Sequence, residues 1–168
     1  MLPQLIHAGI LIETPAQSAP ILPAAVPRAL REIIPVVRAP VSRQGLVFIL
    51  AQLRAAIKLK MTPLGVLIAQ IREKGPAGPI EWDMAQLAMW VDICSAFSAC
   101  RGLRWRAGHC LTSSIAFLSV VRRAGMDARL VLGVSAAPFS AHCWVQAGDC
   151  VLNDRLENVR PFEPLLAI

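Results

Sequence analysis

Residues 110–154 constrain the fold of this chain more than any other stretch, because they combine the patterns of a helix and of paired strands. The stretch opens with Cys110 and later brings His142 and then Asp154. A thiol, an imidazole and a carboxylate in this order are the parts of a cysteine nucleophile, its base and the acid that orients the base. Whether they act together depends on the elements between them.

The first part of the stretch is expected to form a helix. Apolar residues recur at helical spacing from Leu111 to Val121, and Gly125 suits a left-handed stop. Cys110 then lies in the first turn, where unpaired backbone N–H groups lower the pKa of a thiol and stabilise an oxyanion. The alternative is a structural role, because free cysteines are commonly small buried hydrophobic residues.

The second part is expected to form an antiparallel hairpin. Residues 128–134 are an apolar run typical of a buried strand, and residues 141–146 alternate in polarity. Gly148 and Asp149 supply a turn, after which residues 150–154 return along the sheet.

The length of this turn decides whether His142 and Asp154 meet. A three-residue loop centred on Gly148 places them opposite each other on one face of the sheet. A two-residue turn shifts the register by one residue and places them on opposite faces. The catalytic interpretation therefore predicts an odd-numbered loop or a bulge.

Three runs in this part of the chain resemble one enzyme family. They are CLTSS at the helix start, VVRRAGMDARLVLGV at its end and along the first strand, and PFSAHCWVQAGDCVLND across the hairpin. Together they resemble the lasso-peptide leader peptidases, the B proteins of lasso-peptide biosynthesis, which are transglutaminase-like cysteine proteases related to papain. The pair Thr112-Ser113 departs from the family pattern, in which many members carry an arginine before the serine.

The resemblance implies an α+β fold, in which a helical N-terminal layer precedes a nucleophile helix packed on a small antiparallel β-sheet. It implies that Cys110 is the nucleophile, His142 its base and Asp154 the orienting acid. The implied reaction is removal of the leader from a ribosomally made lasso-peptide precursor before macrocyclisation, without a cofactor or metal. The implied partners are that precursor, a leader-recognition domain and an ATP-dependent lasso cyclase.

Three other functions stay open. The same residues serve transglutaminase-like acyl transfer or amide hydrolysis, and an idle set would leave a non-catalytic scaffold for the leader or the cyclase. A zinc site made of Cys110, His142 and Cys150 is a weaker alternative, because their spacing matches no compact zinc pattern.

The composition raises the question of a membrane. Hydrophobic residues make up 55% of the 168, and the mean hydropathy is +0.54. The most apolar stretch, residues 46–56, is interrupted by Gln52 and Arg54, and no run reaches the roughly 18 uncharged apolar residues of a spanning helix. We therefore expect no membrane span, whereas a helix that lies on a membrane surface is compatible with the sequence.

Cysteine content and charge bear on location and partners. The five cysteines form no close pair and no signal peptide is evident, which favours reduced thiols and a cytoplasmic location. The net charge of +6 has one notable cluster, Arg101, Arg104 and Arg106, which lacks the extended stripe and stacking aromatics of a nucleic-acid surface. We interpret this cluster as a solvated approach to Cys110 and expect no nucleic-acid partner.

The length is that of one domain with two segments ahead of it. Residues 1–14 resemble the closing helix of a winged-helix leader-recognition domain, or are an ordinary N-terminal arm. Residues 15–41 are rich in proline and alanine and are expected to form a linker with one short helix at residues 28–34. Residues 42–168 are expected to form the transglutaminase-like peptidase domain.

Three helices are expected ahead of Cys110. Residues 45–61 are amphipathic, residues 62–74 follow with Thr62 as N-cap, and residues 81–99 form a longer helix. The predicted buried stripe of the first is Leu46, Ile49, Leu50, Leu53 and Ile57, and that of the third is Met84, Leu87, Val91 and Cys94. The tail up to Ile168 is expected to dock on the sheet.

Overall fold

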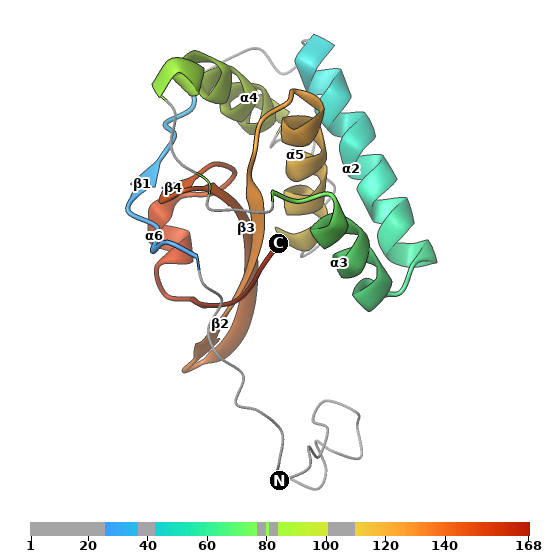
Figure 1. Ribbon diagram of the computed structural model, residues 1–168, viewed down its shortest axis with the longest axis vertical. Helices are drawn as coiled ribbons and strands as arrows, with labels where there is room; N and C mark the ends of the chain where they lie inside the picture. Colours follow the sequence, from blue (N-terminus) through green and yellow to red (C-terminus); the bar gives the residue numbers. More distant parts are fainter. Residues whose placement is uncertain (1–25, 37–42, 77–79, 81–83, 101–109) are drawn as a thin grey trace, which may run out of the picture.

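A computed structural model describes residues 26–36, 43–76, 80, 84–100 and 110–168 of the chain. It contains a five-stranded sheet with the strand order β1-β4-β3-β2-β5 (Figure 1). β1 runs parallel to β4, and the other neighbouring strands are antiparallel. The strands are β1 (Arg31–Glu32), β2 (Arg129–Ala136), β3 (Phe139–Ala147), β4 (Cys150–Val151) and β5 (Glu163–Ala167).

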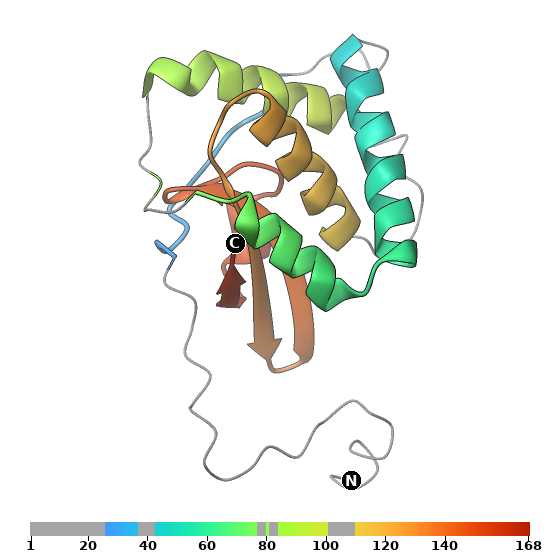
Figure 2. The same ribbon diagram turned by 45° about the vertical axis from the view of Figure 1, so that its right-hand side comes forward.

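Helices lie on both faces of this sheet. Helices α2 to α5 gather on one face, and the short helix α6 packs on the other (Figures 1 and 2). The arrangement confirms the predicted α+β fold class, with helices that precede a helix packed on a small sheet. The helices are α2 (Arg43–Met61), α3 (Leu64–Glu73), α4 (Leu87–Ala99), α5 (Cys110–Arg123) and α6 (Leu156–Val159), and the 3-10 helix η1 spans Met84–Gln86.

The larger core lies between the sheet and the helical layer. Phe48 of α2, Phe97 of α4 and Phe117 of α5 meet there, with ring centroids 5.0 to 5.9 Å apart. Helix α5 is central to this core, because every residue from Ser113 to Leu118 is buried. A helix buried on all sides in this way is held by packing rather than by its own propensity.

The ends of α5 and of the chain follow the sequence closely. Gly125 has a φ of +73° after the last turn of α5, which confirms the predicted left-handed stop. The C-terminal residues return as β5 beside β2, and Ile168 exchanges two backbone hydrogen bonds with Leu130. The predicted docking of the tail is therefore confirmed.

The buried face of α2 is opposite to the predicted one. The residues that face the core are Gly45, Phe48, Ala51 and Ala55. The five residues of the predicted stripe are instead 37% to 54% exposed, namely Leu46, Ile49, Leu50, Leu53 and Ile57. Small residues let α2 pack closely on α5, but a hydrophobicity pattern weights leucine and isoleucine above alanine and therefore selects the wrong face.

Two predicted helix starts also differ. Helix α3 begins at Leu64 with Pro63 at its N-cap position and without a side-chain cap, so Thr62 is not the cap. The third helix starts as the 3-10 turn at Met84, whose side chain is 65% exposed instead of buried, and residues 81–83 lie outside the described residues. The predicted burial of Cys94 is confirmed.

Residues 28–34 form an extended segment instead of the predicted short helix. β1 pairs with β4, and the N–H groups of Leu30 and Arg31 both donate to the carbonyl oxygen of Asp149. The Arg31 side chain also donates from Nε to the Asp149 carboxylate at 3.0 Å. These long-range bonds draw part of the segment predicted as a linker onto the edge of the sheet.

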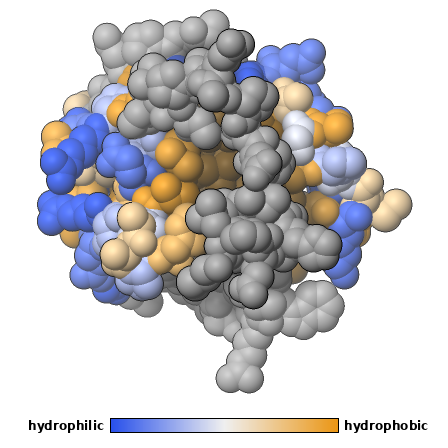
Figure 3. Space-filling model, turned by 90° about the horizontal axis from the view of Figure 1, so that it is seen from below, coloured by the Kyte–Doolittle hydropathy of each residue, from blue (hydrophilic) through white to orange (hydrophobic). Residues whose placement is uncertain are grey.

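Apolar groups also reach the surface of the molecule. Viewed from below, an apolar area lies between hydrophilic groups on either side (Figure 3). Within the described residues, no helix is both long enough and apolar enough to cross a bilayer.

The observed orientation of α2 predicts that two side-chain truncations lower the free energy of unfolding by unequal amounts. Phe48→Ala should lower the free energy of unfolding by about 3–5 kcal/mol, because the ring is 1% exposed and contacts two other rings. Ile57→Ala should lower it by less than about 1 kcal/mol, because this side chain is 52% exposed. Urea denaturation of both variants checks this, and equal losses would contradict the observed packing.

Candidate active site

Cys110 is the first residue of α5 and is partly exposed. The pKa of its thiol lies below the ordinary value, mainly because the sulfur hydrogen-bonds with the imidazole of His142. Burial opposes this effect, whereas the charge of the ring and backbone hydrogen bonds from Cys143 and Leu111 add to it. The contact with His142 therefore favours a thiolate, and the backbone N–H of Leu111 in the first turn adds to the effect.

The other four cysteines differ from Cys110. Burial raises the pKa of Cys143 to about 12 and that of Cys150 to about 11. It also raises the pKa values of Cys94 and Cys100. All five are free thiols, so Cys110 is the one cysteine that combines access with a stabilised anion.

His142 lies on β3 and contacts both other candidate residues. Its Nε2 is 2.8 Å from Oδ2 of Asp154, which leaves Nδ1 as the ring nitrogen for the thiol of Cys110. The hydrogen bond with Asp154, and then that with Cys110, raises the pKa of His142 to about 9 against the effect of burial. At neutral pH the ring is therefore protonated beside a thiol that favours its anion.

Asp154 completes the contact from the segment that follows β4. Burial acts to raise the pKa of Asp154, but hydrogen bonds from His142, Asn158 and the N–H of Arg155 outweigh it and lower this pKa to about 2. The bonds from Asn158 Nδ2 and from the Arg155 N–H, 2.7 and 2.8 Å long, both go to Oδ1. Oδ2 thus remains directed at the imidazole as a fixed negative charge.

The turn after β3 is not the predicted one. It has two residues, because Ala147 pairs directly with Cys150, so the prediction of an odd-numbered loop is wrong. The ladder ends at Val151, and the next three residues are bends, of which Leu152 still donates its N–H to the carbonyl oxygen of Val145 before the segment leaves the sheet. His142 and Asp154 meet because β4 is short, and a ladder that continued would have separated them.

Two aromatic rings flank the imidazole. The centroid of Trp144 lies 6.1 Å and that of Phe162 lies 5.1 Å from the ring of His142. Gly133 pairs with His142 in the ladder, and a Cβ there would lie 2.9 Å from the Trp144 ring and 3.0 Å from Cβ of Phe162. Sequence reasoning missed this role, although a glycine inside a strand is a known signal of close approach.

A buried chain of hydrogen bonds connects the elements that carry the three candidate residues. Asn153 accepts the N–H of Val145 at 2.7 Å and donates to the hydroxyl of Ser114 at 2.9 Å. That hydroxyl donates in turn to the carbonyl oxygen of Cys143 at 2.9 Å. The chain ties α5, β3 and the segment after β4 to one another.

Each member of this chain is close in sequence to a candidate residue. Ser114 lies one helical turn after Cys110, and Asn153 directly precedes Asp154. Ser114 and Asn153 are both buried polar residues with their hydrogen bonds made inside the protein. Sequence reasoning gave neither of them a role, because a serine in a helix and an asparagine after a turn are common.

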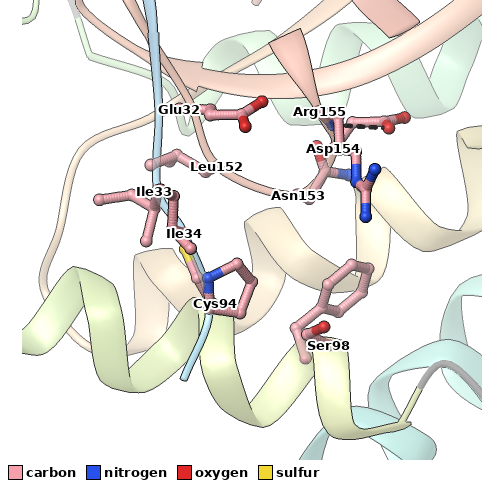
Figure 4. A pocket seen from close by; sticks show the side chains of 11 residues that line it. Glu32, Ile33, Ile34, Cys94, Ser98, Leu152, Asn153, Asp154 and Arg155 are labelled. Carbon is pink, nitrogen blue, oxygen red and sulfur yellow. Dashed lines mark hydrogen bonds between the residues drawn. The ribbon is translucent and has the colours of Figure 1, made fainter. Parts of the chain in front are cut away.

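A cavity of about 250 Å³ opens beside Asp154 (Figure 4). It lies between the segment that follows β1, helix α4 and the residues after β4. Glu32 and Arg155 line it with charge, and its apolar lining includes Ile33, Ile34, Phe97 and Leu152. The site therefore adjoins an apolar space with opposite charges at its border.

Two further expectations from the sequence concern a zinc site and the residues that precede the helix. Among the described residues, no three His, Cys, Asp or Glu side chains form a group able to hold a metal ion, so the alternative zinc site is not supported. Outside the described residues lie the residues before the helix and the basic cluster, namely Gly108, His109, Arg101, Arg104 and Arg106.

The geometry places the thiol of Cys110, the imidazole of His142 and the carboxylate of Asp154 in successive contact. A thiolate is the reactive form of a cysteine, and an imidazolium beside it can return a proton to a leaving group. The carboxylate on Nε2 fixes the tautomer and orientation of the ring. The arrangement is suited to nucleophilic catalysis through a covalent intermediate.

Comparisons with known proteins relate the chain to one superfamily. A family model described as the Transglutaminase-like superfamily matches residues 49–167. The microcin J25-processing protein McjB of Escherichia coli is 44% identical over 45 residues, which are 27% of this chain and 22% of that relative. The match thus spans about a fifth of the relative's length. No solved structure matches the chain significantly. The transglutaminase-like relationship that the sequence resemblance implies is confirmed, and the short match agrees with the resemblance to the B proteins.

The hydrogen-bonded contact predicts the pH dependence of Cys110 alkylation. The rate with iodoacetamide should rise with pH through a midpoint below the ordinary thiol pKa of 9.0, because His142 stabilises the thiolate. In Asp154→Asn the pKa of His142 should fall below about 9, and the midpoint for Cys110 should move upward. Peptide mass spectrometry reports each cysteine separately, so the four buried thiols serve as internal controls. Unchanged midpoints in the variant would contradict the link through His142.

The buried chain of hydrogen bonds predicts that two substitutions lower the free energy of unfolding by unequal amounts. Asn153→Ala should lower the free energy of unfolding by about 1–3 kcal/mol, because the buried N–H of Val145 loses its partner. It should also slow alkylation of Cys110. Asn158→Ala removes the exposed hydrogen bond from Asn158 to Asp154 and should lower the free energy of unfolding by less than about 1 kcal/mol. Urea denaturation measures both, and equal costs would show that the buried chain contributes little.

Proposed function

Because the chain belongs to the Transglutaminase-like superfamily, we propose that it is a cysteine peptidase with Cys110 as nucleophile, His142 as base and acid, and Asp154 as the orienting group. Members of that superfamily are generally cysteine-dependent enzymes. The observation that carries the proposal is the position of His142, whose Nε2 lies 2.8 Å from Oδ2 of Asp154 and whose ring hydrogen-bonds with Cys110. This contact lowers the pKa of Cys110, whereas burial raises the pKa of the four other cysteines. A structural cysteine would be expected to follow the other four.

The proposed substrate is a ribosomally made lasso-peptide precursor, cleaved between leader and core. The runs around Cys110 and His142 that resemble the lasso-peptide B proteins support this substrate. The partial match to a protein named for microcin J25 processing supports it as well. The partners that we propose are a leader-recognition domain and an ATP-dependent cyclase that closes the freed core, all in the cytoplasm.

The proposed reaction proceeds in two steps. The Cys110 thiolate attacks the carbonyl carbon of the scissile peptide, and the backbone N–H of Cys110 donates to the oxyanion. The His142 imidazolium gives its proton to the leaving amine as the peptide bond breaks, which leaves a thioester on Cys110. The neutral ring then takes a proton from water, whose oxygen displaces the thiolate and releases the acid. Asp154 remains ionised throughout.

The second candidate is amine acyl transfer, which the description of the matching family model as transglutaminase-like supports. It uses the same thioester but ends with an amine in place of water. The chemistry of the two differs only in the acceptor, so the products distinguish them.

We expect Cys110→Ala to abolish leader removal while the fold is kept. Cleavage of the leader–core precursor, followed by mass spectrometry, should fall at least about a thousandfold, because no other described thiol is both accessible and activated. Cys100→Ala is the matched control, since it removes a buried cysteine that lies at the end of α4, and it should keep activity within a fewfold.

The same assay contains the tests of the alternatives. Cleavage retained by Cys110→Ala would remove this residue from the mechanism. A product that carries an added amine, when one is supplied, would favour acyl transfer. Absence of both products, together with alkylation of Cys110 no faster than that of an ordinary thiol, would favour the scaffold.

A further inference from the structure

Helix α2 exposes a continuous apolar stripe on the side that faces away from the core. We call it the outer stripe and define it as Leu46, Ile49, Leu50, Leu53, Ile57 and Met61, each with 37% to 79% of its surface exposed. Each member lies three or four residues from at least one other member, so all lie along one side of the 19-residue helix. Leu64 and Val66 extend the apolar surface onto α3.

This stripe is unusual for a protein surface. Single exposed apolar residues need no explanation, but a contiguous patch of large ones marks a site of interaction. The opposite side of α2 is already buried through Phe48, Ala51 and Ala55. A helix that is apolar on both sides is typically covered on both.

The charges of α2 restrict what covers it. The helix has four basic residues and no acidic one, and all four are exposed. At 100° per residue, Arg54 and Lys58 lie along one edge of the outer stripe, and Lys60 lies within it in the last turn. Positive charge therefore borders the apolar surface along one edge and at its C-terminal end, which is complementary to an anionic surface.

We propose that the outer stripe binds the surface of an anionic lipid membrane, with α2 lying in the plane of the interface. The helix is about 28 Å long, and its aliphatic side chains enter the boundary between headgroups and acyl chains. The basic side chains at the edges extend to the phosphates of the headgroups. Binding of this kind is peripheral and requires no spanning helix.

The shape and composition of the stripe favour lipid over a protein partner. Helix α2 lies along the outer edge of the molecule in both views, so a flat surface reaches it without displacing another labelled element (Figures 1 and 2). The centres of protein interfaces are enriched in aromatic residues and depleted in lysine. The outer stripe has no aromatic member, Lys58 lies beside it, and Lys60 lies between its members in the last turn.

Sedimentation with lipid vesicles tests the proposal on the full chain. The protein should pellet with vesicles of phosphatidylglycerol and phosphatidylcholine in equal parts, and much less with phosphatidylcholine alone. Added salt should release it. The double variant Leu50→Glu, Leu53→Glu should lower vesicle affinity at least about tenfold. Arg54→Gln and Lys58→Gln should each lower it about fivefold.

Phe139→Glu is the matched control, because Phe139 is 80% exposed at the start of β3, away from α2. It should bind vesicles like the unaltered chain. Near-ultraviolet circular dichroism and the alkylation rate of Cys110 verify that each variant is folded, and neither depends on peptidase activity.

Several results would overturn the proposal. They are an unaltered chain that stays in the supernatant, and equal loss of binding in Phe139→Glu and in the double variant. Light scattering that shows a lipid-independent dimer, which the double variant abolishes, would assign the stripe to a second copy of the chain. Binding of a purified leader-recognition domain to the stripe, without vesicle binding, would assign it to a protein partner.

Discussion

The buried hydrogen bonds of Asn153 are the interaction on which the rest of the site depends. Its side chain takes the place of a backbone partner for Val145 just where the ladder between β3 and β4 has ended. The same side chain reaches the hydroxyl of Ser114 on α5. An unpaired polar group at this depth would be costly. The polypeptide can therefore leave the sheet here only because Asn153 supplies hydrogen-bond partners to the N–H of Val145 and the hydroxyl of Ser114. The next residue, Asp154, is thereby delivered to His142.

The electrostatics of the site follow from this geometry. A carboxylate held by two further donors cannot turn away from the imidazole, and the imidazole in turn stabilises the thiolate at the start of α5. Each charge lowers the cost of burying the next, which is why the pKa of Asp154 falls and that of His142 rises. The remaining cysteines have no such partner, and their burial keeps them neutral.

The helical layer shows a different use of apolar residues. Alanine and glycine on the inner side of α2 allow it to approach α5, and Phe48 fills the space beside Phe117. The larger aliphatic residues remain on the outer side, next to Arg54 and Lys58. The high hydropathy of the chain therefore comes partly from an exposed surface, which is the one that we propose to lie on a membrane.

The sequence by itself determined the types of element and the chemical groups of the site. The helix at Cys110, its stop at Gly125 and the strands on either side of the hairpin follow from local periodicity and turn residues. The family resemblance followed from runs that are contiguous in the chain. These features depend on residues near one another in sequence, which is what a pattern records.

Only the tertiary structure decided how these parts meet. The face that α2 buries depends on how closely α5 can approach it, and the extended form of β1 depends on the carbonyl and carboxylate of Asp149. The contact of His142 with Asp154 depends on a strand that ends early and not on the length of its turn. Each outcome is fixed by contacts between residues far apart in the chain, and local propensity carries no information about such contacts.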